Sequence, residues 1–218
     1  MATNSDTAVA ANQQASRVYI VEDDPAVSDS LEQLLRLKGY LTASYPSAEA
    51  FLAAARPEWS GCAIVDIRLP GMSGLELQSE IARRGINLPV IIVTGHGDTR
   101  NSRAAFKAGA ADFLEKPIDT DVLLDVVAGS ISARVQRQRN DAEHAALAQR
   151  LERLTARENQ VLALIIEGKL SREIAEALEI SPRTVEVYKS RLMDKLHVKR
   201  TIDLLRQMIA YRLSESGR

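Results

Sequence analysis

The chain has one cysteine, no long apolar run and none of the features of a secretion signal at its start. Cys62 is the only cysteine in 218 residues, so an intrachain disulfide is excluded, which suits a reducing compartment. No apolar run approaches the roughly 20 residues that a membrane-spanning helix needs. Residues 1–16 are mostly small and polar, without a basic start or an apolar block, and predict a disordered tail. Together these absences predict a soluble, cytoplasmic protein without a membrane partner.

A glycine-rich phosphate loop is also missing. Nucleotide-binding folds place such a loop after the first strand, where its backbone amides cradle an anion. Here the first apolar run leads into Glu22-Asp23-Asp24-Pro25, whose carboxylates repel phosphate and attract a hard cation. Gly95-His96-Gly97 lacks a third glycine, and Gly168-Lys169 lacks the remainder of a Walker motif. The sequence therefore favours a cation site over a nucleotide site.

Charge is divided unevenly between the two halves of the chain. Residues 17–131 carry 11 basic and 16 acidic side chains, whereas residues 154–218 carry 12 basic and 9 acidic ones. An acidic half followed by a basic half indicates a cation site joined to a nucleic-acid binder.

Short runs rich in Val and Ile alternate with helix-length stretches in the first half, which indicates buried parallel strands with crossover helices. This pattern predicts a doubly wound, flavodoxin-like α/β domain over 17–137 with five parallel strands. Ser73 and Asp98 are predicted helix N-caps, and Gly39, Gly85 and Gly109 stand where helices should end. Strands are predicted near 17–21, 40–45, 62–66, 89–93 and 111–114, and helices near 26–38, 47–55, 73–84, 99–108 and 119–137.

The second half is predicted to be entirely helical. Residues 138–153 contain no glycine or proline and carry a thin apolar stripe at helical spacing. A helical linker is therefore expected there, with a flexible tether as the alternative. Thr155 with Glu158 forms a capping box, and Ser181-Pro182 starts another helix. A small four-helix domain over 154–218 is expected, with helices near 156–166, 172–178, 182–196 and 201–212.

Five polar residues follow the predicted strands of the first half. Functional groups gather at the carboxyl ends of parallel strands, so we expect one shared crevice. Its oxygen ligands suit Mg²⁺, its aspartate at 66 can act as a nucleophile toward a phosphoryl group, and its ammonium and hydroxyl can bind phosphoryl oxygens. The five residues are Glu22, Asp23, Asp66, Thr94 and Lys116.

The helix predicted from Pro182 has two different faces. Val185, Tyr188, Leu192 and Leu196 form an inner apolar stripe, and residues 181–200 contain six basic residues against two acidic ones. With the preceding helix and a short turn, this segment predicts a helix-turn-helix that binds DNA, although a charged helix face can also be merely solvated.

These motifs carry two resemblances. Ile-Val-Glu-Asp-Asp, Val-Asp-Ile-Arg-Leu-Pro-Gly-Met-Ser-Gly, Val-Thr-Gly-His-Gly-Asp and Glu-Lys-Pro resemble the receiver domain of two-component response regulators. Leu-Thr-Ala-Arg-Glu, Glu-Ile-Ala and Ile-Ser-Pro-Arg-Thr-Val-Glu-Val resemble the LuxR-type DNA-binding domain. Together they are similar to a FixJ-like response regulator with a receiver over 17–137, a linker over 138–153 and a DNA-binding domain over 154–218.

The receiver resemblance implies Asp66 as phosphoacceptor, Glu22 and Asp23 with Asp66 as Mg²⁺ ligands, and a cis bond between Lys116 and Pro117. Phe113, three residues before Lys116, matches the aromatic switch position. Thr94 and Lys116 are the residues expected to contact the phosphoryl group. The expected partners are a sensor histidine kinase, promoter DNA, RNA polymerase and, on phosphorylation, a second copy of the chain.

The LuxR-type resemblance places the helix from Pro182 in the major groove of DNA. Tyr188 stands where histidine is usual in the family, which puts local contacts to the DNA backbone in doubt. Glu186, Val187, Ser190 and Arg191 are the candidates for base edges, and Arg183, Lys189 and Lys195 for phosphates.

Two other functions stay open at this point. An aspartyl-phosphate phosphotransfer enzyme should carry an acid-base carboxylate two residues after its nucleophile, but that position is Arg68. We therefore expect slow autodephosphorylation and no enzymatic turnover. A phosphorylation-independent interaction module would not need all five crevice residues.

Overall fold

The computed structural model describes residues 16–95 and 110–215 and divides into two compact units, Met1–Arg137 and Gln138–Arg218. The first unit is built on a five-stranded sheet in the order β2-β1-β3-β4-β5, in which every neighbouring pair is parallel. This is the flavodoxin-like arrangement that the sequence predicts. The strands are β1 Arg17–Val21, β2 Leu41–Tyr45, β3 Gly61–Asp66, β4 Val90–Thr94 and β5 Asp112–Glu115.

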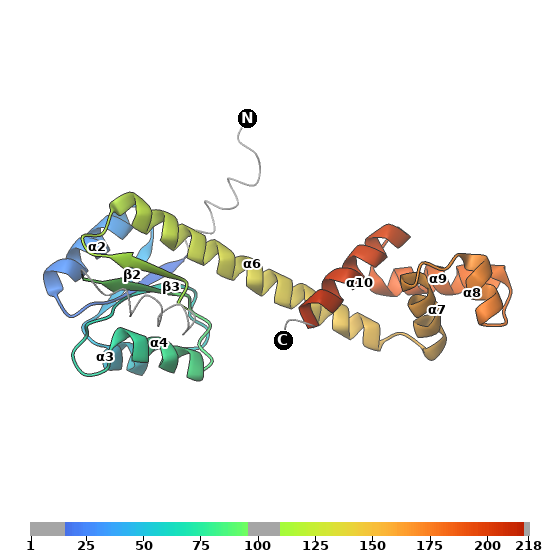
Figure 1. The fold of residues 1–218 in the computed structure, drawn as a ribbon, viewed down its shortest axis with the longest axis horizontal. Coiled ribbons are helices and arrows are strands. Elements are labelled where there is room, and N and C mark those ends of the chain that lie inside the picture. The colour runs from blue at the N-terminus through green and yellow to red at the C-terminus, as the bar shows by residue number, and fades with distance from the viewer. Residues whose placement is uncertain (1–15, 96–109, 216–218) are drawn as a thin grey trace, which may run out of the picture. The chain divides into compact units, whose positions relative to one another are not determined.

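Helices cover both faces of this sheet, as Figure 1 shows for the blue-to-green part of the chain. The buried residues of α2 and α6 pack on one face with Val18, Ile20 and Ile64, while those of α3 and α4 pack on the other with Val21 and Val65. Alternate residues of each strand thus enter two separate cores, because successive side chains of a strand point to opposite faces. The helices are α2 Pro25–Leu37, α3 Ala48–Ala54, α4 Gly74–Arg83 and α6 Thr120–Glu152.

The ends of these helices follow local signals. Asp24, Ser47 and Ser73 accept hydrogen bonds from the first-turn amides of α2, α3 and α4, as N-cap side chains do. Gly39 and Gly85 have the positive φ expected after a helix. The predicted helix at 99–108, with Asp98 and Gly109 at its ends, lies outside the described residues. Helix α6 includes both the helix predicted at 119–137 and most of the segment predicted to be a helical linker.

Three aromatic side chains pack together near the start of the central strand β3, where Trp59 lies two residues before the strand. Trp59 stacks on Tyr19 with ring centroids 4.1 Å apart and an angle of 7° between the planes, and Phe51 meets Trp59 edge-on. The guanidinium of Arg134 in α6 donates to the carbonyl oxygens of Trp59 at 2.5 Å and Gly61 at 3.3 Å. These bonds attach α6 to the segment that leads into β3.

The second unit is a helical domain with its own core. Thr155 and Glu158 form the predicted capping box at the start of α7, and Ser181 caps α9 with Pro182 in the first helical position. Leu147 and Leu154 join the core, together with buried residues of α7 to α10. Within the described part of the chain, no helix combines the length and apolar character needed to cross a bilayer. The helices after α6 are α7 Ala156–Ile166, α8 Ser171–Ala177, α9 Pro182–Leu196 and α10 Thr201–Glu215.

Candidate phosphoacceptor site and nucleic-acid interface

Four of the five predicted crevice residues lie at the carboxyl ends of adjacent strands. Asp66 is the last residue of β3 and Thr94 the last of β4, while Glu22 directly follows β1 and Lys116 directly follows β5. Because β1, β3, β4 and β5 are consecutive parallel neighbours in the sheet, the four side chains emerge at one edge.

Lys116 joins two of the carboxylates. Its Nζ donates to Glu22 Oε2 at 2.8 Å and also to Asp66 Oδ2. Glu22 and Asp66 are only 6% and 7% exposed, so two buried carboxylates share one ammonium. Burial raises the pKa of Glu22 above its ordinary value, against the lowering effect of Lys116. Burial alone would lower the pKa of Lys116, but its hydrogen bonds to Asp66 and Glu22 raise it.

The backbone after Asp66 holds the other carboxylate oxygen. The amide of Arg68 donates to Asp66 Oδ1 at 2.7 Å, which leaves Oδ2 on the side of Lys116. A Cβ added at Gly74 would lie 2.2 Å from the carbonyl oxygen of Asp66, so only glycine allows α4 to start this close. Sequence reasoning missed both features, although Gly74 within Met-Ser-Gly was visible in the motif.

The remaining predicted receiver residues lie around this centre. Thr94 is buried, its hydroxyl donates to the carbonyl of Gly95 at 3.2 Å, and its own carbonyl accepts from the amide of Lys116 at 2.7 Å. Phe113 is half-buried on β5 and packs against the core under α3 and α4. Asp23 is exposed, next to Glu22. The peptide bond between Lys116 and Pro117 is cis, as the resemblance implies.

The donor set fits a hard divalent cation in its chemistry. Glu22 and Asp66 converge on a single positive charge, which is now the ammonium of Lys116. Among the described residues, no three Asp, Glu, His or Cys side chains are already gathered closely enough to hold a metal. A Mg²⁺ ion would therefore share the carboxylates with Lys116 and take part of its coordination from water.

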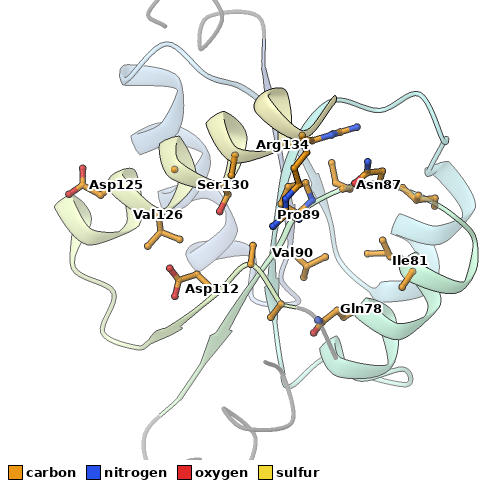
Figure 2. Close-up of a pocket in the computed structure, with 18 residues that line it drawn as sticks. Gln78, Ile81, Asn87, Pro89, Val90, Asp112, Asp125, Val126, Ser130 and Arg134 are labelled. Carbon is orange, nitrogen blue, oxygen red and sulfur yellow. The ribbon is translucent and has the colours of Figure 1, made fainter. Parts of the chain in front are cut away.

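A cavity of the first unit lies away from this crevice. It has a volume of about 590 Å³ and lies between α4 and α6, beside Pro89 and Asp112 where β4 and β5 begin (Figure 2). The crevice lies at the opposite ends of these strands, and none of its five residues lines the cavity. We therefore do not assign the phosphoryl chemistry to the cavity.

In the second unit, α9 has the two faces that the sequence predicts. Val185, Leu192 and Leu196 are fully buried, and Tyr188 is half-buried beside them. The opposite face is exposed and carries most of the candidate DNA contacts, namely Arg183, Glu186, Val187, Ser190 and Arg191.

Two lysines of α9 are bound within the protein. Lys195 Nζ donates to Glu158 Oε2 at 2.7 Å and to the carbonyl of Arg153 at 3.2 Å. Glu158 is 3% exposed, and Lys195, followed by the bonds from Thr155, lowers its pKa. Lys189 Nζ contacts Ser171 and Glu186. Both lysines were expected to contact phosphates, but here their ammonium groups contact groups of the protein.

Comparison with known proteins agrees with this architecture. A family model for the response regulator receiver domain matches residues 18–128. A model for bacterial regulatory proteins of the luxR family matches residues 152–208. Each match lies within one of the two units described above.

Several known regulators match most of the chain. The transcriptional regulatory protein FixJ of Azorhizobium caulinodans is 40% identical over 88% of this chain and 91% of its own length. The response regulator protein TmoT of Ectopseudomonas mendocina is 38% identical over 94% and 92%. The solved structure of the response regulator StyR covers 90% of this chain and 99% of its own, with a TM-score of 0.75 and 36% identity. With a receiver unit and a LuxR-type DNA-binding unit in the same order, the chain belongs to the FixJ-like two-component response regulators and is a transcriptional regulator.

Proposed function

We propose that Asp66 is the residue of this regulator that accepts a phosphoryl group from a sensor histidine kinase. The observation that carries the proposal is the ammonium of Lys116 shared by Glu22 and Asp66, with the other oxygen of Asp66 held by the amide of Arg68. This arrangement aims the carboxylate at an incoming phosphorus atom and keeps a cation beside the oxygens that gain charge.

The chain's own residues then have defined tasks. An oxygen of Asp66 forms a bond to phosphorus while the bond from phosphorus to the donor histidine breaks, and the histidine leaves. Lys116 can bind one phosphoryl oxygen and the hydroxyl of Thr94 another. Glu22, Asp23 and Asp66 would hold Mg²⁺, which neutralises phosphoryl charge when bound. Arg68, exposed two residues after Asp66, offers no carboxylate to activate water, which supports slow autodephosphorylation.

The output of phosphorylation would be a homodimer on promoter DNA. Thr94 would move toward the phosphoryl group and Phe113 would repack, altering the surface of β5 and α6 until it pairs with a second copy. Paired α9 helices would then contact two half-sites and bring RNA polymerase to, or keep it from, the promoter. These partners would place the protein in the cytoplasm.

Phosphoryl uptake from a small acyl phosphate tests the chemistry without a kinase. Intact-mass spectrometry should show one added phosphoryl group in the presence of Mg²⁺, removable by hydroxylamine as expected of an acyl phosphate. Asp66→Asn should abolish the adduct, whereas Asp29→Asn, at an exposed position of α2, should retain it. An equal adduct on the Asp66→Asn protein would contradict the assignment.

A further inference from the structure

A three-residue network connects the two helices of the helix-turn-helix. Ser171, the first residue of α8, donates its hydroxyl to Glu186 Oε1 on α9 at 2.5 Å. Lys189, one turn further along α9, contacts the same Ser171 Oγ at 3.2 Å and the same Glu186 Oε1 at 3.4 Å. We call Ser171, Glu186 and Lys189 the carboxylate clamp.

The clamp leaves one oxygen of the carboxylate available. Oε1 of Glu186 receives both contacts, while Oε2 accepts no hydrogen bond from any residue within 16–95 or 110–215. The Glu186 side chain is 60% exposed and that of Lys189 only 22%. Most of the Glu186 side chain is therefore open to solvent, whereas most of the Lys189 side chain is covered.

The carboxylate of Glu186 lies on the exposed side of α9, which is proposed to face DNA, so its negative charge there needs a physical explanation. DNA is a polyanion, so an uncompensated glutamate at its surface weakens binding to every sequence. In the major groove, however, a carboxylate oxygen can accept from the N4 amino group of cytosine, whereas thymine presents an acceptor at the equivalent position. The hydrogen bond from Ser171, aided by Lys189, lowers the pKa of Glu186 and keeps it ionised as an acceptor.

We infer that Ser171 and Lys189 are positioning residues that hold Glu186 so that its Oε2 reads the amino group of a cytosine. Lys189 then acts on Glu186 by offsetting its charge, and does not act as an independent phosphate contact. This assignment rests on DNA binding by the second unit and names the residues that give it a base preference.

Selection from a library of randomised duplexes tests the base preference in the full-length protein carrying a beryllofluoride mimic of the acyl phosphate. The wild type should enrich cytosine at one position of each half-site. Ser171→Ala and Glu186→Gln should lose that enrichment while keeping the preference at other positions, and Ser171→Thr, which retains a hydroxyl, should preserve it. An unchanged cytosine preference in Ser171→Ala protein with an unchanged circular dichroism spectrum would overturn the inference.

A double-mutant cycle separates the two roles of Lys189. Lys189→Ala should weaken binding to the selected duplex in the wild-type background but have little effect beside Glu186→Gln, a coupling of about fivefold or more. Equal losses in both backgrounds would mean an ordinary phosphate contact and would overturn the charge-offset role. If the wild-type protein selected no sequence at all, DNA recognition itself would be contradicted, and the inference with it.

Discussion

At the scale of single residues, the contact between Lys195 and Glu158 makes the stability of the second unit depend on pH. Glu158 is almost completely buried, so removing its partner leaves a carboxylate poorly compensated. Lys195→Met should lower the free energy of unfolding at pH 7 by about 1–2 kcal/mol, less than a fully buried pair would lose because the Lys195 side chain is 36% exposed.

The sign of the pH dependence follows from the lowered pKa of Glu158. The pair's contribution is fully present above the ordinary glutamate value of 4.5 and is lost as the pH falls through the lower pKa of the folded protein. The loss of unfolding free energy caused by Lys195→Met should therefore become smaller in acid. Hydrogen exchange in peptides from α7 and α9 would measure it, with Lys199→Met, at an exposed lysine, as the control. A deficit that stays constant from pH 7 to pH 3 would exclude this pair as its source.

At the scale of elements, replacing two helix glycines by alanine should change the free energy of unfolding in opposite directions. Gly74 is the first residue of α4, and Gly129 lies inside α6. At Gly74 the added methyl group would meet the backbone oxygen of Asp66 at 2.2 Å, and backbone cannot move aside as a side chain can. Gly74→Ala should cost about 1–3 kcal/mol of stability, as overpacking does. At Gly129, among the described residues, no atom beyond the backbone of its own helix comes within 4 Å of an added Cβ, so Gly129→Ala should stabilise by about 0.5–1 kcal/mol.

Urea unfolding followed by circular dichroism would compare the two glycine variants with the wild type. Gly74→Ala should also take up phosphate more slowly, because the same contact determines where Asp66 and the Arg68 amide lie. Similar stability changes of the same sign in both proteins would show that the contact at Gly74 is easily relieved.

Elements with local signals were predictable from the sequence, and contacts between elements were not. Strands rich in Val and Ile and caps such as Ser73 and Thr155 depend on neighbouring residues, so the pattern alone locates them within a residue or two. The crevice was predictable because parallel strands bring their carboxyl ends to one edge. By contrast, Lys195 lies 37 residues from Glu158, and helical spacing gives the face of a lysine but not where its long side chain ends.

The same limit explains Ser171. Nothing near position 171 signals a partner 15 residues away, since the contact exists only once α8 and α9 are packed. Helix spacing placed Glu186 near the border of the outer face of α9, where it is exposed, but could not reveal which of its oxygens is engaged.

At the scale of the whole molecule, the proposed function requires phosphorylation to change the oligomeric state. Light scattering should find more dimer when beryllofluoride and Mg²⁺ are added to the full-length protein. A ligand must favour one state by about 5.5 kcal/mol to reverse a population from 1:99 to 99:1, so a partial shift is also informative. Phe113→Ala should still accept phosphate but dimerise poorly, because the side chain that repacks is missing.

Asp66→Asn provides the matched control, since it should remain at the resting mass with or without the mimic. An identical balance of monomer and dimer in the wild type under both conditions would contradict the dimerisation step, while leaving the phosphoacceptor assignment to be judged by the mass adduct.

The stacking of Trp59 on Tyr19 also gives the protein a built-in optical reporter. Trp59 is the only tryptophan in the chain and lies in the first unit, so fluorescence excited at the red edge of the indole band comes from that unit alone. Its emission depends on the Tyr19 ring, whose centroid is 4.1 Å away, and on the position of its own backbone carbonyl, to which Arg134 of α6 donates a hydrogen bond. A loosening of α6 from the start of β3 would therefore appear as a change in emission intensity or wavelength, without any label and without interference from the DNA-binding unit.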